Sequence, residues 1–485
     1  MHESKTHEFK SASVKAVNDP SLQNILKKVM NHFDEGRLEA IAEITPERWE
    51  HLREQGRAIK EHAINNLDYY LEMLSNQVSK AGGVVHFAKD SKEATGIVAQ
   101  IALSHGVKSA IKSKSMVSEE MNLNQALTEI GVEPIETDLG EYIIQLAEET
   151  PFHIIAPAMH KTRKDISQLF SDKLGTQATD DREKLAEIAR DVLRDKFFKA
   201  DMGITGANFL VAETGTLVIV TNEGNGRMCS SAPKIHVAIS GMEKLVPSME
   251  DLSTMLRLLP RAATGQRITS YVSLVTGPKR ATDEDGPEEF HLVLVDNGRS
   301  KLLADEELRE SLYCIRCGAC LNICPIYKNV GGHAYGSVYP GPIGAVISPV
   351  MVGLDKAADL PNASSLCGAC KEVCPIKINI PHMLLNLRSK LAEGHESHKV
   401  NRNFRERIFA KSFRFIMSSP FALGLIHKLG RCLQMPFVKN GKIARLRIPP
   451  FSTWTNTKDL PPIAKQSFRD IWKEKLSKED NNGNR

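Results

Sequence analysis

Seven of the nine cysteines of this 485-residue chain lie in two short runs. The first run reads CIRCGACLNICP over Cys314–Pro325, and the second reads CGACKEVCP over Cys367–Pro375. Gaps of two residues let successive thiolates converge on one metal cluster from a tight turn, and the proline then leads the chain away. The spacing C-x2-C-x2-C-x3-C-P is typical of chains that hold iron–sulfur clusters, in which the fourth cysteine reaches a second cluster. This region is therefore expected to fold around two iron–sulfur clusters.

The two runs predict crossed ligation, because each C-x3-C-P element sends its last cysteine away from its own cluster. The first cluster, of the [4Fe–4S] type, would take the first three cysteines of the first run and the last of the second. The second cluster would take the last cysteine of the first run and the first two of the second. The predicted ligands are Cys314, Cys317, Cys320 and Cys374 for the first cluster, and Cys324, Cys367 and Cys370 for the second.

The second run is one cysteine short. A complete run would carry a cysteine at position 364, where this chain has Ser364. The second cluster is then either a [3Fe–4S] cluster or a [4Fe–4S] cluster with a serine, water or partner ligand at the fourth iron. An open iron could bind substrate, and a missing cysteine could equally tune the reduction potential. The sequence leaves these alternatives open.

Zinc is the main alternative metal, because paired C-x2-C elements also bind zinc. The third cysteine at the same spacing and the doubled C-x3-C-P favour iron–sulfur clusters. Disulfides are disfavoured, because the amino-terminal stretch MHESKTHEFKSASVKAV lacks the apolar core of a secretion signal. The two remaining cysteines, Cys229 and Cys432, are interpreted as ordinary thiols.

The composition is that of a globular protein with two or three domains. Hydrophobic residues make up 41% of the chain and the net charge is +4, which gives no indication of a nucleic-acid partner. The longest apolar run, Gly341–Leu354, is too short to span a bilayer. We expect a cytoplasmic protein, with peripheral attachment to a membrane as an alternative. The sequence contains no G-x-G-x-x-G or G-x4-G-K-[ST] motif, so it gives no support for a flavin, nicotinamide or ATP site.

The chain divides into four predicted segments. Residues 1–80 are polar and helical, with Thr45 expected to cap a helix. Residues 81–300 alternate between strand and helix patterns, which predicts an α/β sheet covered on both faces. Residues 301–385 hold both cysteine runs, and the long stretch between the runs suits an α-helical ferredoxin-like domain. Residues 386–485 form a basic helical region that ends in a disordered tail, KLSKEDNNGNR.

Three loops of the α/β segment could carry a ligand site: Ser113–Glu120, Glu213–Thr216 and Asn222–Arg227. Glycine-rich turns beside an arginine can cradle an anion. On this hypothesis Arg227 would pair with the carboxylate of an organic acid and Glu213 would act as a base. The composition of the second and third loops favours ordinary turns instead.

A short buried strand is predicted at His153–Ala158. His153 and His160, which flank it, are interpreted as core histidines whose ring nitrogens are hydrogen-bonded.

The segment 385–450 carries 14 Lys or Arg against three Glu. Within it, charges interleave with Phe404, Ile408 and Phe409. A basic amphipathic helix can lie on an anionic membrane or dock an acidic partner, such as an electron acceptor. A helix face that is simply solvated and binds nothing is an alternative of equal weight to docking.

Several further motifs accompany the cysteine runs. They are ETDLGEYI at Glu136–Ile143, AETGTLVIVTNEGNGR at Ala212–Arg227, and YPGPIGAV at Tyr339–Val346. In this order, the motifs and both runs resemble the iron–sulfur subunit family of bacterial L-lactate utilisation, lactate utilization protein B. The resemblance covers nearly the whole chain.

The resemblance implies that the α/β segment is a LUD domain, similar in fold to CoA transferases and sugar-phosphate isomerases. It implies the seven cysteine ligands named above, with the eighth absent in the family as well. Two companions are implied, a cysteine-rich lactate utilization subunit and a second LUD-domain subunit. The implied role is electron transport while L-lactate is oxidised to pyruvate. Glycolate or another 2-hydroxy acid as the substrate, catalysis by the LUD domain, and a purely structural role for the clusters are the alternatives.

Overall fold

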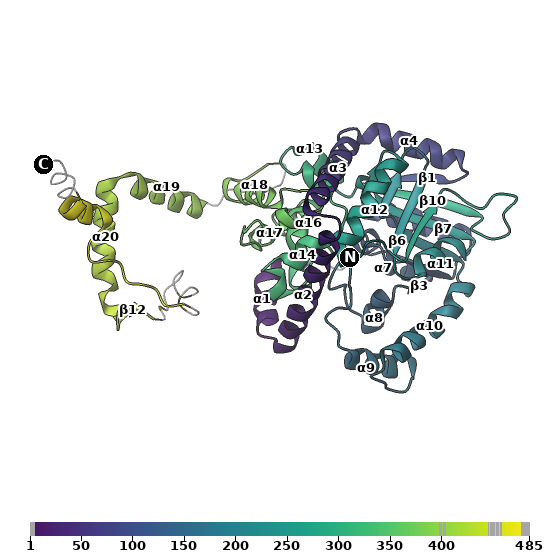
Figure 1. The fold of residues 1–485 in the computed structure, drawn as a ribbon, viewed down its shortest axis with the longest axis horizontal. Coiled ribbons are helices and arrows are strands. Elements are labelled where there is room, and N and C mark those ends of the chain that lie inside the picture. Colours follow the sequence, from purple (N-terminus) through teal and green to yellow (C-terminus); the bar gives the residue numbers. More distant parts are fainter. Residues whose placement is uncertain are drawn as a thin grey trace. The chain divides into compact units, whose positions relative to one another are not determined.

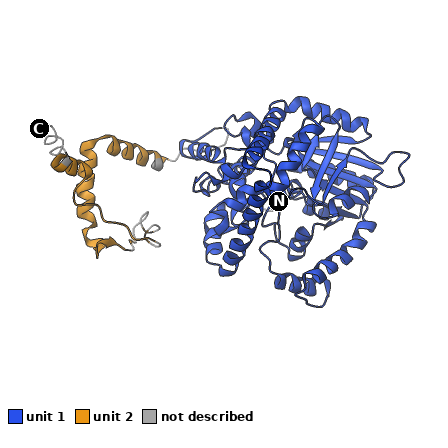
Figure 2. Cartoon of the chain, viewed as in Figure 1, with its two compact units in different colours: residues 1–401 blue, residues 402–485 orange. Residues whose placement is uncertain are grey.

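The computed structural model describes residues 5–396, 400, 404–444, 446, 452, 455 and 458–476. The chain forms two compact units, residues 1–401 and 402–485, which Figure 2 shows in blue and orange. The predicted divisions near residues 80, 300 and 385 all fall inside the first unit and stay predictions.

Four helices open the first unit after a short 3₁₀ turn, and two of them begin with a side-chain cap and a proline. Asp19 accepts hydrogen bonds from the backbone of the next helix, and Thr45 caps its successor, with a proline at the first helical position as predicted. The helices are α1 (Phe9–Val17), α2 (Pro20–Ala42), α3 (Pro46–Asn65) and α4 (Leu67–Lys80), and the turn is η1 (Thr6–Glu8).

A parallel sheet of six strands follows, in the order β1-β10-β7-β4-β2-β3 (Figure 1). The strands are β1 (Val84–Ala88), β2 (Ser109–Lys112), β3 (Glu133–Glu136), β4 (Met202–Gly206), β7 (Ile235–Gly241) and β10 (Glu289–Val295). Neighbouring residues of one strand point to opposite faces. Val237 accordingly lies in one hydrophobic cluster and Ala238 in another. Both faces are covered, so the predicted α/β architecture is confirmed.

Helices alternate with these strands. They are α5 (Ser91–Ser104), α6 (Met116–Glu120), α7 (Leu123–Glu129), α8 (Leu139–Ala147), α9 (Arg163–Leu174), α10 (Arg182–Lys199), α11 (Asn225–Ser231) and α12 (Met249–Thr264). A second sheet has the order β8-β5-β6-β9. Its strands are β5 (Phe209–Val211), β6 (Thr216–Thr221), β8 (Leu245–Val246) and β9 (Tyr271–Val275).

The predicted strand at His153–Ala158 is wrong, because these residues pair with no strand. They form a loop closed by its own hydrogen bonds. The ring Nδ1 of His153 accepts from the backbone N–H of Ile155 at 3.1 Å and of Ala156 at 3.3 Å. The backbone N–H of Phe152 donates to the carbonyl of Pro157 at 2.9 Å. A short apolar run was not enough to distinguish a strand from a buried loop.

The rest of the first unit is built from short helices. They are α13 (Arg299–Ala304), η3 (Arg309–Tyr313), α14 (Ala319–Ile323), α15 (Tyr327–Val330), η4 (His333–Tyr335), α16 (Gly341–Val352), η5 (Leu360–Asn362), α17 (Ala369–Val373) and α18 (Ile380–Glu393). Helix α2 contacts both α12 of the α/β part and α14 of this part. One hydrophobic core therefore runs from the first helices through the second sheet to both cysteine runs.

The described residues of the second unit form two longer helices, a small hairpin and a terminal helical turn. These are α19 (Phe404–Ser418), α20 (Pro420–Gln434), η6 (Met435–Phe437), β11 (Val438–Lys439), β12 (Lys442–Ile443), α22 (Phe468–Ile471) and η7 (Trp472–Leu476). The disordered tail was expected to begin at Lys475, but Lys475 and Leu476 belong to η7, and residues 477–485 lie outside the described residues. Within the described part of the chain, no helix combines the length and the apolar character needed to cross a membrane.

Candidate metal centre

The two cysteine runs adopt the same backbone conformation. Gly318 and Gly368 both have left-handed φ, +76° and +86°, and each precedes a five-residue helix. Those helices end at Cys324 and Cys374, whose φ and ψ are −68° and 121° in the first case and −66° and 121° in the second. The repeat seen in the sequence is thus a repeat in three dimensions.

Ser364 occupies the place in the second run that Cys314 occupies in the first. The backbone N–H of Arg316 donates to Cys314 Sγ at 3.4 Å, and that of Leu366 donates to Ser364 Oγ at 3.1 Å. Arg316 and Leu366 share a positive φ of 62° and 55°. The serine hydroxyl therefore lies where the first run places a sulfur atom.

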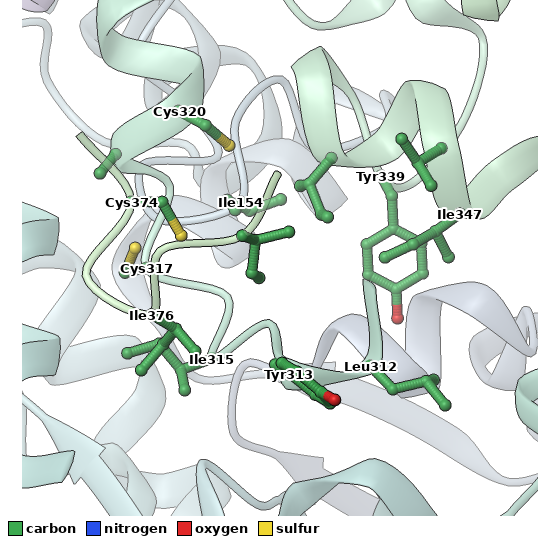
Figure 3. Packing of buried hydrophobic residues seen from close by; sticks show 14 of the residues in the cluster. Ile154, Leu312, Tyr313, Ile315, Cys317, Cys320, Tyr339, Ile347, Cys374 and Ile376 are labelled. Carbon is green, nitrogen blue, oxygen red and sulfur yellow. The ribbon is translucent and has the colours of Figure 1, made fainter. Parts of the chain in front are cut away.

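One cavity brings cysteines of both runs together. It is lined by Cys314, Cys317 and Cys320 of the first run, by Cys374 of the second, and by isoleucines such as Ile154. Figure 3 shows Cys317, Cys320 and Cys374 among these apolar side chains. Cys324 is in a different environment, since it does not line this cavity.

The other three cysteines influence one another. Burial, together with the neighbouring thiols of Cys324 and Cys367, raises the pKa of Cys370 to about 12. Cys367 is exposed, and hydrogen bonds from the Ala369 backbone and the Ser365 hydroxyl lower its pKa. Four of the seven cysteines therefore line one cavity, while Cys324, Cys367 and Cys370 influence one another and Cys370 also acts on Cys320.

The donor set fits an iron–sulfur cluster. Burial raises the pKa of Cys374 to about 11 and that of Cys320 well above the ordinary value. Thiols that are neutral without metal release protons when they bind it, which couples metal binding to folding and to pH. Four sulfur donors in an apolar cavity, with backbone N–H groups directed at Cys374 from Ile376 and Ile378, are the surroundings that such clusters require.

Two buried lysines near the four-cysteine cavity interact with Cys314. Burial lowers the pKa of Lys60 to about 7 and that of Lys244 to about 8, while the charge of Cys314 raises both. Lys60 Nζ donates to the carbonyls of Glu243 at 2.6 Å and Leu245 at 2.9 Å. These lysines come from α3 and from the segment before β8, so elements outside the cysteine runs supply positive charge to the cavity.

Arg316, inside the first run, faces the α/β part. Its guanidinium lies 4.5 Å from the ring centroid of Tyr339 and 3.4 Å from Glu243 Oε1. Its Nη1 is buried and has no hydrogen-bond partner among the described residues. This nitrogen therefore has a free donor beside the cysteine cavity.

An ion-pair network ties these groups together. Arg299 is fully buried. Its Nη1 lies 2.9 Å from Glu120 Oε1, and its Nε lies 2.5 Å from Glu243 Oε2. The Tyr339 hydroxyl donates to Glu120 at 2.6 Å. Although burial alone would raise the pKa of Glu243, Arg299 and Arg316 outweigh it and hold this pKa at about 2. No sequence pattern indicated this network, although Glu120, Arg316 and Tyr339 all lie in the motifs quoted above.

Glu213 and Arg227, the two residues of the organic-acid hypothesis, each have a local partner. Glu213 Oε2 accepts the backbone N–H of Met249 at 3.1 Å, at the start of α12. Arg227, on α11, lies over the ring of Tyr271, 5.4 Å from its centroid. No ion pair or hydrogen bond within the described residues joins Glu213 to Arg227. Each side chain is used in local packing.

The two histidines differ. His153 is 1% exposed and its Nε2 lies 3.1 Å from Asn322 Oδ1, so the prediction of a satisfied core histidine is confirmed. The same prediction for His160 is wrong. His160 Nδ1 is buried without a partner among the described residues, and Nε2 lies 2.8 Å from Glu149.

We expect Arg299→Met to lower the free energy of unfolding by about 3–5 kcal/mol, because Glu120 and Glu243 would keep buried charges without their partner. Chemical denaturation followed by circular dichroism under anaerobic conditions measures this loss. Arg190 pairs with Glu187 on the surface, where its side chain is 67% exposed, so Arg190→Met should change stability by less than about 0.5 kcal/mol. Equal effects of the two variants would contradict the assigned role of the network.

Three regions of the chain match known protein families. Residues 71–295 match the LUD domain, residues 310–378 the 4Fe-4S dicluster domain, and residues 388–477 the C-terminal domain of lactate utilisation protein B. The dicluster match covers both cysteine runs. This match supports the presence of iron–sulfur clusters in the protein.

Full-length relatives agree with these matches. Lactate utilization protein B of Oceanobacillus iheyensis is 44% identical over 481 residues, covering 98% of this chain and 98% of the relative. The protein of the same name from Bacillus licheniformis is 43% identical over 475 residues, with 98% of each chain covered. That from Bacillus cytotoxicus is 44% identical over 458 residues, covering 94% of this chain and 95% of the relative.

Among solved structures, a DUF162 family protein of Deinococcus radiodurans aligns with 47% of this chain and 98% of its own, at 12% identity. Its TM-score of 0.27 is too low to support a statement about the fold. The sequence matches carry the assignment, since they extend over the α/β part, both cysteine runs and the second unit. The chain belongs to the lactate utilization protein B family.

Proposed function

We propose that this chain is the electron-transfer subunit of an L-lactate-oxidising system, in which electrons pass through two iron–sulfur clusters as lactate becomes pyruvate. The observation that carries the proposal is the cavity lined by three cysteines of the first run and Cys374 of the second. The substrate is named from the relatives, which are lactate utilization proteins. Oxidation of lactate releases two electrons, and each bound cluster would take one.

The ligand assignment belongs to this proposal. Cys314, Cys317, Cys320 and Cys374 would hold a [4Fe–4S] cluster. Cys324, Cys367 and Cys370 would hold the second cluster, and the mutual effects on the pKa of Cys370 support that grouping. For the second cluster, both a [3Fe–4S] form and a [4Fe–4S] form with a non-cysteine ligand stay open. The position of the Ser364 hydroxyl supports serine as that ligand.

The surrounding residues suit a relay. Apolar side chains such as Ile154 and Ile376 exclude water from the four-cysteine cavity. Lys60, Lys244 and Arg316 lie close enough to influence Cys314 electrostatically and would favour the reduced, more negative cluster. Cys367 is the exposed member of the second group, so a partner could approach this group most closely.

Crossed ligation predicts crossed effects of substitution. Cys374→Ser should remove the signal of the cluster assigned to the first run, whereas Cys324→Ser should alter the cluster assigned to the second. Iron analysis and EPR of anaerobically prepared protein measure both. Cys432→Ser is the matched control, since Cys432 is an exposed thiol outside both groups. The assignment is wrong if each substitution affects only the cluster of its own run, or if the intact chain binds about four irons.

If this chain only relays electrons, lactate must be oxidised by a companion subunit. Removing two electrons from a 2-hydroxy acid calls for a cofactor that takes both, such as a flavin, and we expect the isolated, cluster-loaded chain not to oxidise L-lactate with a one-electron dye. The same preparation should be reduced by dithionite, and by lactate once the companion subunits are added. Turnover by the chain alone that is lost in Arg227→Ala would contradict the relay and support catalysis by the LUD domain.

We further propose the two companions as partners: a cysteine-rich subunit, and a second LUD-domain subunit. The relatives' name implies a system of several subunits, and the isolated chain has no recognised two-electron site.

The second unit carries a surface suited to an anionic membrane. On α20, Phe421, Leu425, Leu429 and Leu433 recur at intervals of four residues and are all exposed, from 50% to 82%. Residues four apart lie on one face of a helix. The basic residues of the same helix, Lys428 and Arg431, lie beside that stripe, as on helices that rest in a lipid headgroup region. Helix α19 repeats the pattern, with exposed phenylalanines and a basic face formed by Arg407, Lys411 and Arg414.

We expect the full chain to sediment with vesicles that contain anionic phosphatidylglycerol and not with purely zwitterionic vesicles. Binding should weaken as salt rises, because the basic groups are exposed. The double reversal Lys428→Glu and Arg431→Glu should abolish it, whereas the control Arg190→Glu on α10 should not. The proposal is contradicted if vesicle binding depends neither on the charge of the lipid nor on the double reversal. Loss of companion-subunit binding in the double variant, without any vesicle binding by the unaltered chain, would assign the surface to a protein partner.

A further inference from the structure

A second cluster of metal-ligating side chains lies away from the cysteines. Glu149 and His160 belong to the loop between α8 and α9, and His333 belongs to η4 beside the first cysteine run. One donor atom from each of the three side chains lies within 4.8 Å of the other two. Two imidazoles and one carboxylate are a donor set that binds divalent transition metals, zinc above all.

Neighbouring groups already orient two of the three donors. The Nε2 of His333 lies 2.7 Å from the carbonyl of Thr150, to which it can only donate. The proton is therefore on Nε2, and the lone pair of Nδ1 is available to a metal. Lys161 contacts Oε1 of Glu149, so Oε2 is the oxygen that faces His160 Nε2, at 2.8 Å. A backbone carbonyl and a lysine thus play the supporting roles that fixed metal ligands need.

His160 is packed among aromatic side chains. The ring stacks on Phe152, with 4.8 Å between centroids, and meets the ring of His333 at 4.9 Å. Phe152 is itself buried and lies edge-on to His333 at 4.9 Å. The two imidazoles are thus packed against one aromatic wall.

We propose that Glu149, His160 and His333 bind a single zinc ion, separate from the cysteine sites, that fastens the α8–α9 loop to the segment after the first cysteine run. A tetrahedral zinc ion with ligands at about 2.0 Å keeps its donors about 3.3 Å apart. Glu149 and His160 would therefore separate by about half an ångström on binding. Three protein ligands leave the fourth position to water, and the Glu149 side chain, 33% exposed, gives solvent access.

The test uses the full chain with its clusters loaded, kept anaerobic, and zinc chloride as the probe. We expect one zinc ion per chain beyond the iron content, measured by elemental analysis after gel filtration. Zinc K-edge absorption should show a first shell of nitrogen and oxygen only, at about 2.0–2.1 Å, whereas zinc in a cysteine site would show sulfur at about 2.3 Å. Zinc should also raise the unfolding temperature, because a ligand stabilises the state that binds it.

His160→Gln and His333→Gln should each lose the bound zinc and the rise in unfolding temperature, with the iron content unchanged. Glu149→Gln changes an exposed ligand that takes no part in the ring packing, and it should weaken zinc binding at least tenfold. His382→Gln is the matched control, since His382 pairs with Glu307 on the surface and should leave zinc binding unchanged. The proposal is overturned if the loaded chain retains no zinc, if the zinc shell contains sulfur, or if the three variants bind zinc as the unaltered chain does.

Discussion

The ion pairs of Arg299 with Glu120 and Glu243 join the α/β part of the chain to the cysteine cavity. Arg299 and Glu243 are both 1% exposed or less, so neither charge is solvated by water. Charges in such surroundings are tolerated only when every partner is present, since the cost of removing one from water is several kcal/mol. The network therefore fixes the positions of its members closely. Arg316 is one of them, through Glu243, and it lies two residues from Cys314.

This arrangement makes residues of the LUD domain part of the surroundings of the cysteine cavity. The domain supplies Glu120, Glu243 and Lys244, and helix α3 adds Lys60. An iron–sulfur cluster with four thiolate ligands carries net negative charge, which buried cations stabilise. Removing the α/β part would therefore change the electrostatics of the cavity as well as its packing.

The sequence predicted those features that depend on local spacing. The cysteine intervals and the proline after each run were sufficient to expect two similar turns, and the turns share their backbone angles. Strand and helix periodicity was sufficient to expect the covered parallel sheet. The ion-pair network was not predictable in this way, because Glu120, Glu243 and Arg299 are separated by more than fifty residues and meet only in the folded chain. The loop at His153–Ala158 was misjudged for a related reason. Its apolar residues are buried against distant segments, and its backbone groups are satisfied by His153 rather than by a neighbouring strand.

Hydrogen bonds with earlier segments explain why the two cysteine runs would not be stable as a separate small domain. Arg53 of α3 donates to the carbonyl of Cys374 at 3.0 Å, and Arg57 of the same helix donates to the carbonyl of Lys377 at 3.0 Å. The hydroxyl of Tyr327 donates to the backbone carbonyl of Phe152 at 2.8 Å. A chain that began at residue 300 would keep all seven cysteines and lose each of these partners, leaving buried polar groups unpaired at a cost of about 1–3 kcal/mol each. The cysteine spacing specifies where metal can bind, whereas the preceding residues hold that region in the conformation that brings the two runs together.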